Sequence, residues 1–525
     1  MLIKKRLSLL IMSDTGVNTK RIAKNTLYMY LRMFVTMLVS LFTTKINYQA
    51  LGIDNFGIYN VVGSIIVFFT FINSGLTTAT RRYITAELAQ GDEGSQRNVF
   101  NLSILAHVLI ALIIVVLGET VGLWAVNHLL NIPDGRMTAA NIVYQLSIFT
   151  AVLNVMQAPY IAAITANERM NIYAYISIFD IISKLAVAYG VLYLSGDKLI
   201  IYAILLTFSS TSVILINRIY CHHSFAMCRF KKPHNKILLK EMFNYMGWNL
   251  AGQGMVVLTN QGVTVLVNTF FNVAANAAMG VSNQITNVVN AFVINFQVAF
   301  NPQITKLYVS RDYEELRALA NRCSRISSYL TLIFIVPICF QIRNFLSLWL
   351  GDYPEYAVEF CIFTLIAIFI DAISAPLWMI LSSDKDVKKY QLVISAIYSL
   401  NFIGAYLVLK MGYPPYSVIV VRMIVFLCAV IARLLLVKEK MPVYSIIGWV
   451  RALGGGTVKI LLLPGVCIFV MYHYCMDNLF FELFVYGGIS FVSVCFSIYM
   501  FGLTFSERNV INEKVRLVFN RFRRI

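Results

Sequence analysis

Long apolar runs dominate this chain and constrain its fold more than any other feature. About fourteen of them reach the length of roughly 20 residues that an α-helix needs to cross the hydrocarbon core of a bilayer. Only 13% of the residues are charged and 59% are hydrophobic, whereas soluble domains average about 25% charged residues. We therefore expect an all-α polytopic membrane protein. The runs cover residues 25–46, 58–80, 99–124, 139–165, 172–194, 199–217, 244–268, 275–304, 326–349, 357–380, 391–409, 415–437, 454–474 and 479–503.

The basic residues indicate an orientation in the membrane. The formal net charge is +18, which in a soluble protein would point to nucleic acid. Here Lys and Arg gather before the first run, in alternate loops and in the tail, so the positive-inside rule predicts both termini in the cytosol at a cell (inner) membrane. We expect membrane lipids, not nucleic acid, around the chain. The other loops hold only Lys45, Arg136, Lys198, Arg343 and Lys410.

An internal repeat relates the fourth run to the tenth. Pro159 and Pro376 each follow an alanine, and Tyr173 and Tyr390 each stand fifteen residues beyond that alanine. A shift of six helices predicts two parallel six-helix lobes plus two C-terminal helices. The two prolines predict a matched pair of bends, either static kinks or moving hinges. The predicted segments are a basic cytosolic leader (1–24), an N-lobe (25–218), a basic cytosolic linker (219–243), a C-lobe (244–437), the two further helices (438–503) and a basic cytosolic tail (504–525).

Side-chain amides form stripes on two of the expected helices, at helical spacing along one face. A single amide in a membrane helix more often bonds a neighbouring helix than a ligand. A stripe along most of a span is better explained by a hydrated cavity, because polar groups are costly in hydrocarbon. We therefore expect these amides to bind a hydroxyl-rich substrate such as a sugar. They are Asn249, Gln253 and Asn260 on one helix and Asn283, Asn287, Asn290 and Gln297 on the other.

Charged residues inside the runs are the other candidates for function. Arg32 could bind a phosphate through paired hydrogen bonds or extend to the cytosolic interface. Asp180 and Lys184 lie one helical turn apart, which favours an internal ion pair over an ion-coupling carboxylate beside an anion contact. Asp371 is a candidate proton or sodium site, unless Arg422 neutralises it.

No cofactor or metal is expected. Cys221, His222, His223, Cys228 and His234 share one loop, but their spacing fits no standard zinc pattern. The chain contains no Walker loop, HExxH motif or nucleophile triad, which argues against ATP hydrolysis and against an enzyme in general.

Short motifs give the chain a family resemblance. They are Leu51-Gly52 followed by Phe56-Gly57-Ile58-Tyr59, Gly75-Leu76-Thr77 before Arg81-Arg82-Tyr83-Ile84, Ala277-Ala278-Met279-Gly280, and Asn301-Pro302. With these motifs and the repeat, the region 25–437 resembles the polysaccharide flippases of the multidrug, oligosaccharidyl-lipid and polysaccharide exporter superfamily. The extra helix pair is similar to that of lipid II flippases. Those proteins carry an acidic residue beside their first-helix arginine, where this chain has Met33.

The resemblance implies alternating access, in which two lobes turn a polyprenyl-diphosphate-linked oligosaccharide from the cytosolic to the outer leaflet for polysaccharide or lipopolysaccharide biosynthesis. Proton or sodium coupling remains open. One alternative is a cation-coupled multidrug exporter of the same fold. A second is a membrane glycosyltransferase or polymerase, although the longest outside stretch, near 125–138, is short for a catalytic domain.

Overall fold

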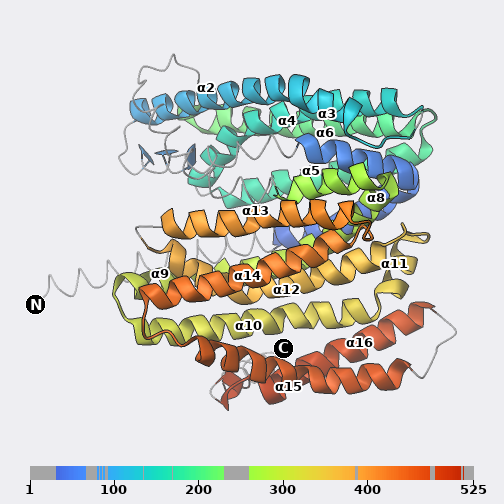
Figure 1. The fold of residues 1–525 in the computed structure, drawn as a ribbon. Helices are drawn as coiled ribbons and strands as arrows, with labels where there is room; N and C mark the ends of the chain where they lie inside the picture. Colours follow the sequence, from blue (N-terminus) through green and yellow to red (C-terminus); the bar gives the residue numbers. More distant parts are fainter. Residues whose placement is uncertain are drawn as a thin grey trace, which may run out of the picture. The chain divides into compact units, whose positions relative to one another are not determined.

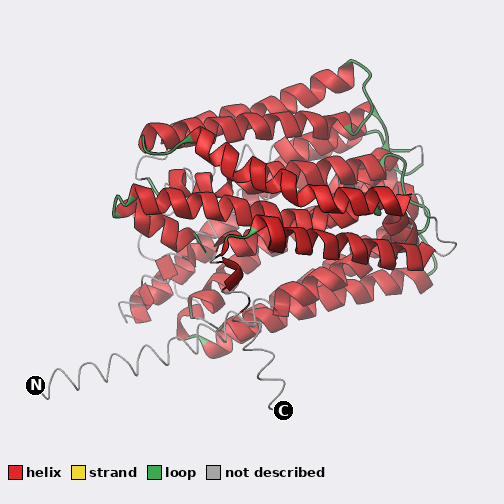
Figure 2. Cartoon of the chain, turned by 90° about the horizontal axis from the view of Figure 1, so that it is seen from below, coloured by secondary structure: helices red, strands yellow, loops and turns green. Residues whose placement is uncertain are grey.

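The structure is a computed structural model. It describes residues 31–66, 80–81, 83–84, 87–88, 93–133, 135–167, 169–229, 259–298, 300–384, 388–472, 479–505, 507–509 and 512. The predicted leader, residues 230–243 of the predicted linker, and the amides Asn249 and Gln253 lie outside these residues. Helices and loops make up the described part of the chain, and no strand occurs in it (Figure 2).

The chain divides into two compact units, Met1–Ala277 and Ala278–Ile525. The first contains helical residues 31–66 and 259–270. Its other elements are α2 (Glu93–Leu117), the π-helix η1 (Gly118–Gly122), α3 (Leu123–His128), α4 (Met137–Ala166), α5 (Met170–Tyr193), α6 (Lys198–Ser224) and the 3-10 turn η2 (Ala226–Cys228). Helix α8 (Val273–Val298) begins at the end of this unit and continues into the next (Figure 1).

The second unit is also helical throughout its described residues. It continues with α9 (Asn301–Val309), α10 (Tyr313–Phe340), α11 (Ile342–Leu350), α12 (Ala357–Ser382), α13 (Lys388–Lys410), α14 (Ser417–Lys440), α15 (Ile446–Tyr472), α16 (Leu479–Ser497) and the π-helix η3 (Ile498–Gly502). Helices are the expected solution, because a helix satisfies its own backbone hydrogen bonds where hydrocarbon offers no partner.

Ten of the described helices are long and apolar enough to cross a membrane. They overlap the third to sixth and the ninth to fourteenth predicted runs, so a multi-pass membrane protein is confirmed. The ninth run was predicted over 326–349, whereas the helix there is α10, Tyr313–Phe340, and the end of the run lies in α11. The first, second and seventh runs lie partly outside the described residues. The eighth contains α8, which is helical over 26 residues but is not among the ten, because its amides lower its hydropathy.

Glycines break the helical path where L-residues would be strained. Gly52, within helical residues 31–66, has a φ of +77°, which interrupts regular α-geometry between the first two predicted runs. Gly412 has a φ of +82° in the turn between α13 and α14. Left-handed backbone carries no Cβ penalty at glycine, so these positions suit tight reversals.

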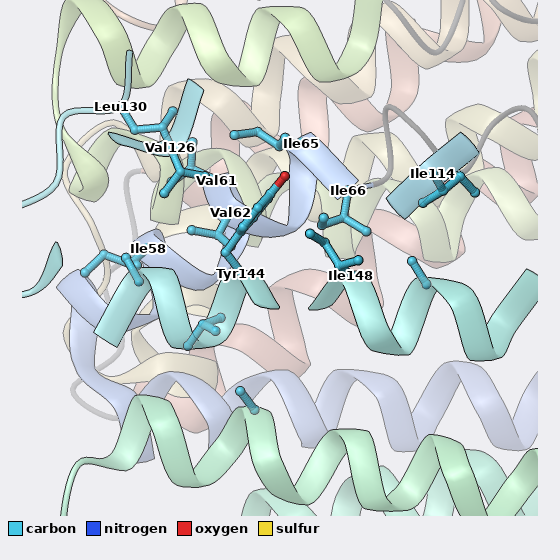
Figure 3. Packing of buried hydrophobic residues seen from close by; sticks show 14 of the residues in the cluster. Ile58, Val61, Val62, Ile65, Ile66, Ile114, Val126, Leu130, Tyr144 and Ile148 are labelled. Atoms are coloured by element: carbon cyan, nitrogen blue, oxygen red, sulfur yellow. The ribbon is translucent and has the colours of Figure 1, made fainter. Parts of the chain in front are cut away.

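The core of the first unit joins residues 58–66 to α2, α3 and α4 (Figure 3). Ile58, Val62 and Ile114 are fully buried there. Tyr144 is also buried, and its hydroxyl donates to the Gly118 carbonyl at 2.7 Å. Widened π-turns leave backbone carbonyls in need of donors. The tyrosine thus supplies one to η1 while its ring fills the core.

The same packing order occurs in both units. In the first, α4 packs against α2 and α6, and α5 packs against α6. In the second, α12 packs against α10 and α14, and α13 packs against α14. Pro159 lies buried inside α4, and Pro376 lies buried inside α12. Four helices of one unit therefore correspond to four of the other, as the sequence repeat requires.

Helices α15 and α16 fall outside this correspondence and pack against α10. The Tyr329 hydroxyl donates to the Gly502 carbonyl at 3.1 Å, and the Trp449 indole donates to Ser324 at 3.2 Å. Glu507 accepts two hydrogen bonds from Arg325, both at 2.8 Å. The C-terminal segment thus contacts α10 near the middle of that helix, at Ser324, Arg325 and Tyr329.

Candidate functional site

An ion-pair cluster lies inside the second unit between α12 and α14. Arg433 donates to the Asp371 carboxylate at 3.0 Å and to the Tyr398 hydroxyl at 2.8 Å, and it also donates to Ser374. The Arg433 side chain is 7% exposed, whereas that of Asp371 is 49% exposed. The guanidinium is therefore held by three side chains, and the carboxylate keeps one accessible side.

Asp371 thus has a partner, but not the one that sequence reasoning considered. Asp371 was predicted as a proton or sodium site, with neutralisation by Arg422 as the alternative, and its ion-pair partner is Arg433. The two arginines are eleven residues apart on α14, about three helical turns, so both fall on its buried face. That spacing is the signal that could have identified Arg433 from the sequence.

The amides of α8 do not share one environment. Gln297 is buried, and its amide donates to the Ala372 carbonyl at 3.0 Å and to Ser327 at 3.3 Å. It therefore connects α8 to α10 and α12 beside Asp371. Asn283 and Asn287 are exposed one turn apart, and Asn290 is half-buried. One end of the stripe is a packing contact, and the other presents accessible amides.

In the first unit, Arg32 lies over the ring of Tyr173 on α5, with 4.9 Å between the guanidinium carbon and the ring centroid. Its Nε is buried without a hydrogen-bond partner. Tyr390, the repeat-related residue of the second unit, is buried next to Arg433. Each of the two tyrosines marked by the sequence repeat thus lies against an arginine.

The remaining candidate site residues described in the first unit are Asp180 and Lys184 on α5 and Asn260. Lys184 pairs with Asp180 at 2.8 Å within α5, and Ser183 shares a hydrogen bond of 2.6 Å with Ser209 on α6. The ion pair is the arrangement that sequence spacing favoured. Asn260 is exposed near the start of helical residues 259–270.

A polar clamp joins helical residues 31–66 to the N-terminal ends of α4 and α6, and the sequence did not predict it. Arg136 donates to both Asp197 oxygens, at 2.6 and 3.0 Å, and to Asn55 at 2.6 Å. Asp197 also caps the N-terminus of α6 by accepting from two of its backbone amides. The hydrogen bond from Arg136 lowers the pKa of the Asp197 carboxyl. Sequence reasoning treated Arg136 only as an exception to the charge asymmetry.

Within the described residues, no group of three or more His, Cys, Asp or Glu could hold a metal ion. Cys221 and Cys228 are buried, and their side chains contact one another. His222 lies near the Tyr160 ring, and His234 lies outside the described residues.

The fold defines a class: a helical multi-pass membrane protein with two similarly packed units. Residues 253–407 match the family model named MatE. No curated protein matches the chain in sequence.

Solved structures share the fold at low sequence identity. The lipid II flippase MurJ in an inward closed conformation superposes with a TM-score of 0.60 at 14% identity, covering 91% of this chain and 99% of the other. An inward-facing multidrug resistance MATE transporter of the MOP superfamily gives 0.64 at 12% identity, with 79% and 99% covered. A MOP transporter from Pyrococcus furiosus gives 0.56 at 14% identity, with 80% and 96% covered.

The chain therefore has the fold of the MOP superfamily, the group of multidrug, oligosaccharidyl-lipid and polysaccharide exporters. The resemblance drawn from the sequence is confirmed at this level.

Proposed function

We propose that this protein flips a polyprenyl-diphosphate-linked oligosaccharide from the cytosolic to the outer leaflet of a cell (inner) membrane. It acts by alternating access and as a carrier, not an enzyme. The observation that carries the proposal is the exposed amide pair Asn283 and Asn287 on α8. Lipid tails cannot satisfy carboxamides, so a helix that exposes two of them one turn apart must meet water or a polar ligand.

The cationic side chains supply the second part of the argument. Arg32 and Lys184 are suited to the charge of a diphosphate, because guanidinium and ammonium groups donate several hydrogen bonds to phosphate oxygens. The Nε of Arg32 is buried without a hydrogen-bond partner, so this donor is unsatisfied in the protein alone. We assign Asn249, Gln253, Asn260, Asn290 and Gln297 to the sugar-binding set as predicted, with Gln297 acting through its contact with α12.

Loss of the gene product, followed by assay of lipid-linked glycan on each leaflet, tests the function directly. We expect glycan to accumulate on the cytosolic leaflet. The double variant Asn283→Leu/Asn287→Leu should reproduce this accumulation, while a control at the exposed, lipid-suited position Leu427→Ala on α14 should not. Normal glycan display in the deletion strain would contradict the proposal.

A cation-coupled multidrug exporter is the second candidate, favoured by the MatE match over residues 253–407 and by the half-exposed carboxylate of Asp371. Unchanged glycan display with raised drug sensitivity in the deletion strain would select it. In either case Asp371 and Asp180 are the carboxylates available for proton or sodium coupling. If Asp371 couples transport, Asp371→Asn should remove its dependence on the ion gradient; full retention would assign the residue a structural role.

The prolines Pro159 and Pro376 are proposed as hinges of the two units. Each lies inside a helix that packs against two neighbours of its own unit. Replacement by alanine restores a backbone donor and should stiffen the helix. A hinge role predicts slower flipping at unchanged substrate affinity, whereas a static kink predicts no change in rate.

A further inference from the structure

Arg422 is the most unusual charged group in the described part of the second unit. It is 9% exposed, and both its Nε and Nη2 are buried without a hydrogen-bond partner. The ion pairs of the described residues include Arg433 on the same helix but not Arg422. A buried guanidinium without a counter-charge is expensive, because burial removes hydration that nothing replaces.

Extension of the Arg422 side chain into water does not explain why its Nε and Nη2 are buried without partners. An arginine near a helix end can keep its stem in hydrocarbon and place its guanidinium in the aqueous interface. Such a guanidinium would place its donors in water, whereas the Nε and Nη2 of Arg422 are buried. These two donors therefore lie inside the unit, and α13 and α14 also bury the side-chain oxygens of Asn401 and Ser417 without partners.

Arg422 lies near the N-terminal end of α14. It stands five residues into α14, which begins at Ser417, so its Cα lies about 8 Å from the helix start at a rise of about 1.5 Å per residue. Side chains in a helix tilt toward its N-terminus. This tilt carries the guanidinium toward the membrane surface at that end.

The same end of the hairpin has the character of a membrane interface. Tyr406 and Tyr413 are 40% and 56% exposed, and tyrosines gather where headgroups meet hydrocarbon. Lys410 is exposed at the end of α13, with its ammonium 5.9 Å from the Tyr406 ring centroid. An exposed lysine and a buried arginine near the same end of a hairpin are a suitable pair for an anionic headgroup.

We propose that Arg422 is the core of a lipid-phosphate site at the α13–α14 hairpin, with Lys410 at its rim. The guanidinium donates to phosphate oxygens. The phosphate belongs either to a membrane phospholipid or to the isoprenoid diphosphate of the carrier substrate. Only the second source rests on the proposed function.

Binding to the purified, full-length protein in detergent tests the site. The probes are dioctanoyl phosphatidylglycerol, a short-chain polyprenyl diphosphate and inorganic phosphate, each titrated while thermal unfolding is followed. The variant is Arg422→Gln. The matched control is Arg343→Gln. Arg343 is an exposed arginine on α11, which lies between α10 and α12 in the chain.

We expect wild type and Arg343→Gln to be stabilised by at least one lipid probe and Arg422→Gln to bind it at least about tenfold more weakly, because a buried charge-assisted contact is lost. Dependence on Arg422 for the diphosphate alone identifies the carrier as the source, and dependence for both lipids identifies lipid phosphate in general. Equal affinities for all three probes in wild type and Arg422→Gln would overturn the site.

A second measurement keeps the result interpretable if Arg422→Gln folds poorly. Arg422→Met retains the aliphatic bulk and removes the buried charge, so without lipid it should unfold at a higher temperature than wild type. It should also fail to respond to the lipid probe. Failure of glycan flipping together with retained, Arg422-dependent phospholipid binding would reject the proposed function and leave this site intact.

Discussion

Replacing Asp371 with asparagine should destabilise the second unit by about 2 kcal/mol. Removing one partner of a fully buried ion pair costs about 3–5 kcal/mol, while an exposed pair contributes about 0–1 kcal/mol. Asp371 is 49% exposed and Arg433 only 7%, so this pair falls between the two cases. Arg433 would also keep its contacts with Ser374 and Tyr398, which limits the loss.

The assay is thermal unfolding of the purified protein in one detergent. For a folding unit of about 150–250 residues, each 1 kcal/mol shifts Tm by about 2–4 °C, so Asp371→Asn should lower Tm by about 4–8 °C. Arg433→Met should cost less, because it leaves behind a half-exposed carboxylate and not a buried cation. The double variant should be more stable than the sum of the single losses predicts. A wild-type Tm for Asp371→Asn, or strict additivity, would refute this reasoning.

Two further perturbations address the first unit. A Cβ at Gly57 would lie 2.1 Å from the backbone oxygen of Val273, whereas one at Gly63 would meet nothing within 4 Å. Gly57→Ala should therefore lower Tm strongly, and Gly63→Ala should stabilise the folded protein by about 0.5–1 kcal/mol, as in a helix interior, and raise Tm slightly. Equal effects of the two substitutions on Tm would contradict the packing. Arg136 lowers the pKa of Asp197 in the folded protein. The clamp therefore stabilises the folded protein at pH values above the unfolded pKa of about 4, and this stabilisation is lost as the pH falls through the folded pKa. Arg136→Gln should then be less stable than wild type at neutral pH, and the gap should narrow in strongly acidic buffer; a gap independent of pH would show that the ion pair contributes nothing.

Sequence reasoning reached the fold because the main constraint is local. A bilayer demands long apolar helices with internally paired backbones, and the spacing of such helices is visible in the chain without knowledge of any contact. The repeat was visible for a similar reason, since Pro159 and Pro376 stand at matched positions. The packing order around α4 and α12 then agreed with it.

The candidate site was only partly accessible in this way. Helical spacing of four residues placed Asp180 beside Lys184, and the structure contains that pair. The partner of Asp371 lies 62 residues away on another helix, and hydropathy carries no information about which of two arginines on one face will meet a carboxylate. The same limit applied to Gln297, whose partners are on α10 and α12.

The sequence by itself determined a multi-pass helical protein with an internal repeat, because hydropathy and helical periodicity are properties of neighbouring residues. Tertiary structure alone decided which charges on different helices neutralise one another. Arg433 meets a carboxylate while Arg422, on the same face of α14, has its Nε and Nη2 buried without partners. That difference depends on the register between helices, since a guanidinium finds its counter-charge only where packing brings a carboxylate within about 4 Å.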